Sequence, residues 1–179
     1  MSPLGYAVNR ALKKTWAALG IPADYAERRH LPIQRVATRL VSIGPAADDG
    51  KILRLAPRAA AAWHNMRTAG AKDGVELLPL SGYRSVRRQT QIIRNKLAAG
   101  EKIDDILRLV AAPGCSEHHA GRALDIGSPA AQELDEQFAK TAEFCWLKKH
   151  AARFGYHLSY PRANPHRIGY EPWHWCWRP

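Results

Sequence analysis

GCSEHHAGRALDIGSP, residues 114–129, is the stretch of this sequence that decides both the fold and the chemistry. In its strand-like part, RALDIG, Leu124 and Ile126 face one side of an extended backbone and Asp125 faces the other. We expect the apolar pair to be buried, so that Asp125 points into whatever covers the second face. A carboxylate near a core is costly unless it is ion-paired, hydrogen-bonded or bound to a metal. An ion pair with an arginine is one interpretation, and a functional site is the other.

Histidines in and beyond this stretch favour a metal site. His118 and His119 lie in a turn-forming segment between two glycines, so either could reach Asp125. A third histidine, His174, follows in the motif EPWH. Two imidazoles and a carboxylate supply the three N/O ligands of a catalytic zinc site, whose fourth position stays open for water. Zinc would lower the pKa of that water to about 7 and make hydroxide available at neutral pH.

Two further residues suit hydrolysis at such a site. Glu171 precedes Pro172, which favours an extended backbone and lets the carboxylate approach a metal held by His174 without ligating it. Glu171 could then act as a general base. In SGYRS, Gly82 permits a tight turn that delivers Arg84 to a strand end, where a guanidinium suits a carboxylate or an oxyanion. Taken alone, these residues also fit a surface acid and a solvated helix start.

The composition predicts one globular domain with a basic surface. A chain of 179 residues, 46% of them apolar, can bury one substantial core. A net charge of +11 favours polyanionic partners such as nucleic acid, an anionic membrane surface or a bacterial cell wall. The basic residues are dispersed and no nucleic-acid-binding motif stands out, so we expect no nucleic-acid partner.

Hydropathy gives expectations about the compartment. No run approaches the ~18 apolar residues of a membrane span, so we expect no stable membrane insertion. The first 30 residues lack the apolar core of a secretory signal. The protein therefore stays inside the cell, has lost its signal, or leaves by another route.

Local patterns predict an α+β fold with a small, mainly antiparallel sheet flanked by helices. Helices and strands mix without regular βαβ alternation, and two β-like runs around the turn-rich PAADDG indicate a hairpin. Residues 20–35 read as an irregular lead-in and 161–169 as a turn-rich stretch. The expected helices cover 5–19, 57–74, 85–99, 101–110 and 131–154, and the expected strands cover 38–44, 51–57, 75–85, 122–127, 156–160 and 170–177.

Cysteine usage leaves the redox compartment open. The three cysteines, Cys115, Cys145 and Cys176, are too few and too scattered for a disulfide framework or a four-thiolate metal site. Cys115 and Cys176 flank the two ligand-bearing motifs, and they form a disulfide there or are simply small buried residues.

Three motifs in this order and spacing resemble the VanY-type D-alanyl-D-alanine carboxypeptidases. They are SGYRS at 81–85 with Gln89 four residues on, S-x-H-x-x-G-x-A-x-D at 116–125, and E-P-W-H at 171–174. That family belongs to the LAS, or M15, zinc metallopeptidases, which are grouped with lysostaphin-like enzymes and the hedgehog signalling domain. The resemblance implies a hedgehog/D-Ala-D-Ala-peptidase-like fold.

The resemblance also implies domain limits and residue roles. It covers residues 36–179 as a zinc peptidase domain and leaves 1–35 as an N-terminal helical extension of unknown role. It favours His118 over His119 as a ligand, although an exchange of the two stays open. The roles carried over are metal ligands His118, Asp125 and His174 for Zn²⁺, catalytic Glu171 and Arg84, and substrate-binding Ser116, Gln89, Ser81, Tyr83 and Trp173.

The function implied is removal of the terminal D-alanine from peptidoglycan stem peptides by zinc-bound water, with Glu171 as base. We expect a monomer that acts on the cell wall, with holin-type release of a phage enzyme as one route there. The motifs do not separate this activity from that of an L-alanyl-D-glutamate endopeptidase (a phage-type endolysin) or an L,D-carboxypeptidase. A non-enzymatic, zinc-containing cell-wall-binding module is the alternative from another class. Trp173, Trp175 and Trp177 share one face of an extended strand, as core or cleft wall.

Overall fold

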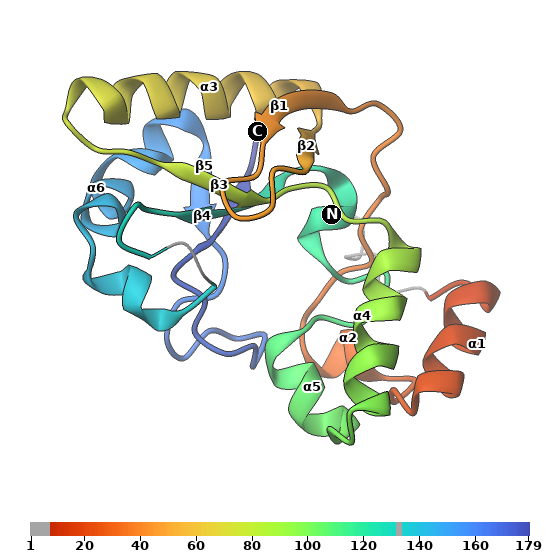
Figure 1. The fold of residues 1–179 in the computed structure, drawn as a ribbon. Coiled ribbons are helices and arrows are strands. Elements are labelled where there is room, and N and C mark those ends of the chain that lie inside the picture. Colours follow the sequence, from red (N-terminus) through yellow and green to blue (C-terminus); the bar gives the residue numbers. More distant parts are fainter. Residues whose placement is uncertain (1–7, 132–133) are drawn as a thin grey trace.

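The computed structural model describes residues 8–131 and 134–179, and it confirms an α+β fold (Figure 1). Within that part of the chain, no helix is long and apolar enough to cross a membrane. In chain order the elements are α1 (Arg10–Leu19), α2 (Tyr25–Arg28), β1 (Val41–Pro45), β2 (Ile52–Leu55), α3 (Pro57–Lys72), β3 (Leu78–Ser81), α4 (Val86–Ala98), α5 (Ile103–Leu109), the 3₁₀ turn η1 (Glu117–Ala120), β4 (Ala123–Gly127), η2 (Glu136–Lys140), α6 (Ala142–His150), η3 (Ala151–Phe154), β5 (Tyr156–Leu158) and β6 (His174–Trp177).

The main sheet is antiparallel, with strand order β3-β4-β6-β5. Its register pairs Asp125 of β4 with Ser81 of β3 on one side and with His174 of β6 on the other. The register between β3 and β4 shifts between Pro79 and Ser81. Residues that lie 49 positions apart in sequence, Asp125 and His174, are therefore direct cross-strand neighbours.

One face of this sheet packs into a sheet core, which is completed by α3 and α6 (Figure 1). Leu124 and Ile126 are fully buried, as the alternation predicts, and the other three residues of β4 are buried too. The sheet core comprises Ile43, Leu55, Ala59, Ala60, Trp63, Met66, Leu77, Leu124, Ile126, Phe138, Trp146, Leu147, Ala151, Tyr156 and Trp175.

A second, helical core lies among α1, α2, α4 and α5, which group together at the lower right of Figure 1. The indole Nε1–H of Trp16 in α1 donates to the carbonyl of Pro113 at 2.8 Å, next to the stretch that leads to η1. The helical core comprises Trp16, Leu19, Ile21, Tyr25, Ala26, Leu31, Ile93, Ile106, Leu107, Ala111, Ala112, Cys115, Tyr160 and Ile168. The domain boundary at residue 36 stays a prediction.

The single helix predicted over 131–154 is wrong. The chain there forms η2, α6 and η3, while 132–133 lie outside the described residues. Asp135 and Thr141 cause the break, because their side chains accept hydrogen bonds from the backbone N–H groups of Gln137 and Phe144. Both capping residues have an extended backbone, so each begins a new helix instead of continuing one.

Other boundaries differ for similar local reasons. The first helix begins at Arg10, after Asn9 caps it, and the predicted residues 5–7 lie outside the described part. The lead-in over 20–35 contains the short helix α2. The predicted hairpin is confirmed, but β1 and β2 form a separate two-stranded sheet.

Candidate active site

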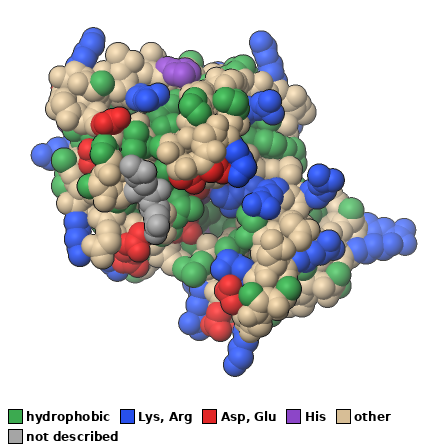
Figure 2. Space-filling view, in the orientation of Figure 1, with side chains coloured by type: hydrophobic (Ala, Val, Ile, Leu, Met, Phe, Trp, Pro, Cys, Tyr) green, Lys and Arg blue, Asp and Glu red, His purple; other side chains and the backbone are tan. Residues whose placement is uncertain are grey.

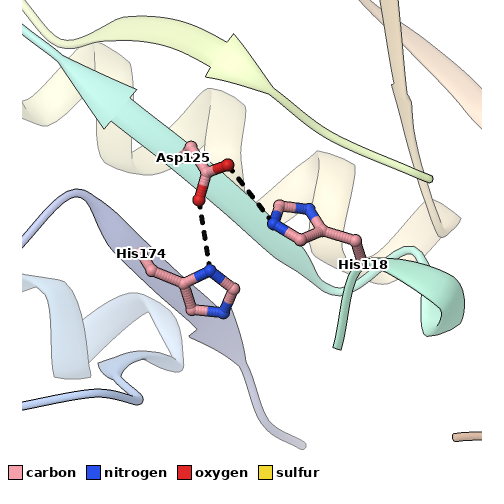
Figure 3. Close-up of side chains that lie close together, drawn as sticks. All are labelled: His118, Asp125 and His174. Carbon is pink, nitrogen blue, oxygen red and sulfur yellow. Dashed lines mark hydrogen bonds and ion pairs between the residues drawn. The ribbon is translucent and has the colours of Figure 1, made fainter. Parts of the chain in front are cut away.

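His118, Asp125 and His174 converge in the structure (Figure 3). Asp125 Oδ2 lies 3.3 Å from His118 Nε2, and Asp125 Oδ1 lies 3.1 Å from His174 Nδ1. One donor atom from each side chain lies within 4.8 Å of the others, and all three residues are buried. The turn η1, the strand β4 and the start of β6 each supply one member.

The orientation of His118 is set by the backbone of the SGYRS turn. Its Nδ1 donates to the carbonyl of Gly82 at 2.7 Å, which leaves the Nε2 lone pair directed at Asp125. Gly82 is required because a Cβ there would lie 2.8 Å from the carbonyl oxygen of Arg54. The glycine that the sequence marks as a turn former thus also anchors the first histidine.

His119 takes a different position. It is fully buried, its Nε2 accepts from the backbone N–H of Gly114 at 3.1 Å, and its Nδ1 donates to the carbonyl of Arg84 at 2.6 Å. Burial lowers the pKa of His119 to about 4, so the ring stays neutral. Because both ring nitrogens are hydrogen-bonded to the backbone, His119 links the segment around Gly114 to the segment around Arg84.

Glu171 lies beside the cluster without joining it. One carboxylate oxygen is 3.6 Å from His174 Nδ1, and the residue is 8% exposed. Burial raises the pKa of Glu171 to about 7, with nearby Asp125 adding to the rise and His174 opposing it. A carboxyl group with such a pKa can exchange a proton near neutral pH.

Arg84 contacts Asp125 and is held by two further side chains. Its Nη2 lies 3.6 Å from Asp125 Oδ2 and donates to Ser81 Oγ at 3.1 Å, and its Nη1 donates to Gln89 Oε1 at 3.2 Å. Gln89 in turn donates to the carbonyl of Ala111 at 2.7 Å. The predicted contact of Asp125 with an arginine is confirmed, and two histidines contact the same carboxylate.

The cluster opens into a cavity of about 240 Å³. Ser116, Gln89 and Trp173 line it, together with Arg84 and Glu171. Ser81 and Tyr83 instead line a neighbouring cavity on the other side of Arg84. Figure 2 shows a hollow between the part built on the main sheet and the part formed by α1, α2, α4 and α5, with Lys and Arg side chains at its border.

Some residues at this site were missed by sequence reasoning. The apolar wall of the cavity consists of Ile92, Leu109, Val110, Ala111, Leu134 and Ile168. Tyr160 packs on the ring of His174, with 4.8 Å between centroids. Glu117 contacts His174 Nε2 at 3.0 Å, and its only sequence signal is its position next to His118.

Without a metal, charge is concentrated in the buried cluster. Burial opposes ionisation of Asp125, but His118 and His174 outweigh it and hold its pKa well below the usual value. Burial likewise opposes protonation of His174, but hydrogen bonds to Asp125 and Glu117 raise its pKa to about 10. His174 thus lies between two carboxylates, an arrangement that favours a positive charge at this point.

The donor set fits a divalent metal. The Nε2 lone pair of His118 and an Asp125 oxygen face each other, and His174 directs Nδ1 at the same carboxylate. Two imidazoles and one carboxylate suit zinc among the common ions. These residues could hold such an ion while Glu171 and Arg84 border the remaining space.

The cavity lining includes none of the three cysteines and only one of the three tryptophans of the last motif. All three cysteines lie in the described part of the chain and are free, with Cys115 and Cys176 buried and Cys145 exposed. Trp175 belongs to the sheet core and Trp177 packs against it, whereas Trp173 lines the cavity.

The chain has the fold shared by the carboxypeptidases LdcB and VanY. The structure of the LdcB LD-carboxypeptidase has a TM-score of 0.72 at 34% identity, covering 82% of this chain and 71% of that one. A VanY D,D-pentapeptidase in complex with Zn(II) has a TM-score of 0.61 at 26% identity, with 82% of each chain covered.

Sequence comparison identifies the family. The family model described as VanY, D-alanyl-D-alanine carboxypeptidase, matches residues 52–179, and the chain belongs to this family. YodJ of Bacillus subtilis (strain 168) is 40% identical over 120 residues, or 65% of this chain and 43% of YodJ. A D-alanyl-D-alanine carboxypeptidase of Enterococcus faecalis is 30% identical over 117 residues, or 60% of this chain and 42% of that protein. The chain thus spans less than half the length of these two relatives.

Proposed function

We propose that this protein is a zinc-dependent carboxypeptidase that removes the terminal D-alanine from peptidoglycan stem peptides. The observation that carries the proposal is the buried cluster of His118, Asp125 and His174, with Glu171 and Arg84 at the same cavity. Membership of the VanY family supports the substrate class. A VanY protein solved in complex with D-Ala-D-Ala supports it as well.

In this proposal His118, Asp125 and His174 hold Zn²⁺. A zinc ion there supplies Lewis acidity, lowering the pKa of water to about 7 and polarising a carbonyl. Glu171 takes a proton from the attacking water and delivers it to the leaving amine nitrogen, a role that its raised pKa supports. The guanidinium of Arg84 stabilises the oxyanion that develops on the scissile carbonyl.

The cavity walls suit a short peptide end. Ser116, Gln89 and Trp173 line the cavity as substrate-binding residues, and the apolar wall accommodates a methyl side chain. Ser81 acts through Arg84, which it contacts, and Tyr83 borders the adjacent cavity where the rest of the peptide would lie. The net charge of +11 favours approach to an anionic wall. We propose a monomer as the acting form.

An L,D-carboxypeptidase is the second candidate, because LdcB, an LD-carboxypeptidase, is 34% identical with a TM-score of 0.72. Cleavage after L-alanine within the stem is a third possibility of the same chemistry. A zinc-containing wall-binding module without activity is disfavoured, because both Glu171 and Arg84 border the cavity.

Mass spectrometry of digested muropeptides tests these assignments. Zinc-loaded protein should release D-alanine from a muramyl pentapeptide, and a chelator should abolish the release. Release from a tetrapeptide alone would assign the L,D activity instead, and a cut between L-alanine and D-glutamate would assign an endopeptidase. If zinc-loaded protein bound wall without cleaving any stem peptide, the enzymatic proposal would be wrong.

A further inference from the structure

Glu117 contacts His174 on the ring nitrogen that faces away from the cluster. Its Oε2 lies 3.0 Å from His174 Nε2, whereas Asp125 Oδ1 lies 3.1 Å from Nδ1 on the other side of the ring. The two side chains are 17% and 4% exposed, so little water competes for the contact. His174 is thus the member of the cluster that has a carboxylate at each nitrogen.

The chemistry of imidazole gives this contact a consequence. A neutral ring carries its proton on one nitrogen and its lone pair on the other, and only the lone pair can bind a metal. An ionised carboxylate only accepts hydrogen bonds, so when Asp125 and Nδ1 both face a metal, Glu117 would hold the ring proton on Nε2. The lone pair is then on Nδ1, toward Asp125 and His118. Histidine ligands are commonly oriented in this way by an acceptor at their other nitrogen.

Glu117 is itself held in place. It lies in η1 between Ser116 and His118, so the turn that presents one cluster histidine also presents the carboxylate that orients the other. Arg178, just beyond the end of β6, places Nη2 3.9 Å from Glu117 Oε1. Glu117 therefore has an ion-pair partner in the segment that directly follows the strand carrying His174.

The two histidines are oriented by partners of different charge. His118 donates to a neutral carbonyl, that of Gly82, whereas His174 meets the charged Glu117. A charged acceptor makes the stronger hydrogen bond and raises the basicity of the ring. Removal of Glu117 would leave the Nε2–H of a buried ring without its acceptor.

We propose that Glu117 is a positioning residue that fixes His174 as an Nδ1 ligand of the metal. This inference rests on the proposed zinc site, and its test measures zinc binding and the position of a proton in addition to turnover. Glu117 touches neither the cavity described above nor the reacting atoms, and it acts through His174.

The test compares zinc affinities by competition with a chromophoric chelator. Glu117→Ala should weaken binding about 10- to 100-fold, and Glu117→Gln should weaken it less, because the carboxamide oxygen still accepts a hydrogen bond. Glu76→Gln, at an exposed position, is the matched control and should bind like the parent. In the zinc-loaded parent, long-range ¹H–¹⁵N spectra should place the His174 proton on Nε2.

Two results would overturn the inference. One is zinc affinity of Glu117→Ala within about threefold of the parent. The other is a His174 proton on Nδ1 in the loaded protein. If the parent itself took up no zinc, the proposed function would fall and this inference with it. Circular dichroism checks that Glu117→Ala is folded. If that variant does not fold, the zinc affinity of the isosteric Glu117→Gln variant and the spectra of the parent test the inference instead.

Discussion

The sheet half of the molecule (the main sheet with α3 and α6) and the helical half (α1, α2, α4 and α5) contribute different parts of the candidate site. The sheet half supplies Asp125 and His174 from paired strands, whose register fixes them side by side. The helical half supplies much of the cavity wall, including Ile168 and Tyr160 from the helical core. Strand register thus places two of the three candidate metal ligands, whereas the residues around them come from helices, turns and loops.

The halves also differ in how they relate to the family. The matched residues 52–179 include all of the main sheet. The helical core draws Trp16, Leu19 and Tyr25 from outside that range. A segment that the family match does not cover therefore braces one wall of the candidate site.

The largest expected effect is a loss of turnover without a loss of zinc when Glu171 is substituted. Glu171→Gln should lower kcat by about 10²–10⁴ while zinc is retained, because the general base is lost and the ligands are not. Steady-state kinetics and zinc analysis of the purified variant provide the two measurements. Activity near that of the parent would remove Glu171 from the reaction.

A core substitution tests whether the sheet half supports the metal site. Trp63 is fully buried in the sheet core, so Trp63→Ala should cost about 3–5 kcal/mol of unfolding free energy. Zinc affinity should fall with it, because β4 and β6 lose the packing that aligns them. Denaturant unfolding and chelator competition measure both. Loss of stability with unchanged zinc affinity would contradict the coupling.

The raised pKa of Glu171 also makes the unfolding free energy of the metal-free protein depend on pH. Its pKa rises from 4.5 in the unfolded chain to about 7 in the fold, so the unfolded state loses its proton first as pH increases. Stability contributed by the protonated form is present below pH 4.5 and is lost as pH rises through about 7, at a cost of about 3 kcal/mol.

Glu171→Gln should abolish that loss. In chelator-treated protein the variant should be no more stable than the parent at pH 4.5 and more stable at pH 8. Thermal unfolding at the two pH values measures the difference. An equal gain at both pH values would show that the effect comes from packing and not from ionisation.

The smallest expected effect lies in the helical half. Trp16→Phe removes the hydrogen bond to Pro113 and should cost about 1 kcal/mol of unfolding free energy. Because Ser116 follows this stretch, we expect KM to rise while kcat and zinc affinity stay close to those of the parent. A fall in zinc affinity equal to that of Trp63→Ala would erase the distinction between the two halves.

Local pattern accounts for much of what the sequence predicts. Alternation along RALDIG buries Leu124 and Ile126 and turns Asp125 to the other side, because successive strand residues face opposite ways whatever surrounds them. The same local rules mislead over 131–154, where capping by Asp135 and Thr141 competes with helix continuation.

By itself, the sequence determined the α+β class, the apolar face of the central strand and the set of residues able to bind a metal. The motif resemblance favoured His118 over His119, but only the tertiary structure gives the physical reason. The Nδ1 atoms of the two rings bind the carbonyls of Gly82 and Arg84, which lie about 35 residues away in sequence. The contact of Glu117 with His174 spans 57 residues in the same way. Side-chain alternation is a property of a short segment, whereas ring orientation depends on acceptors that only packing brings close.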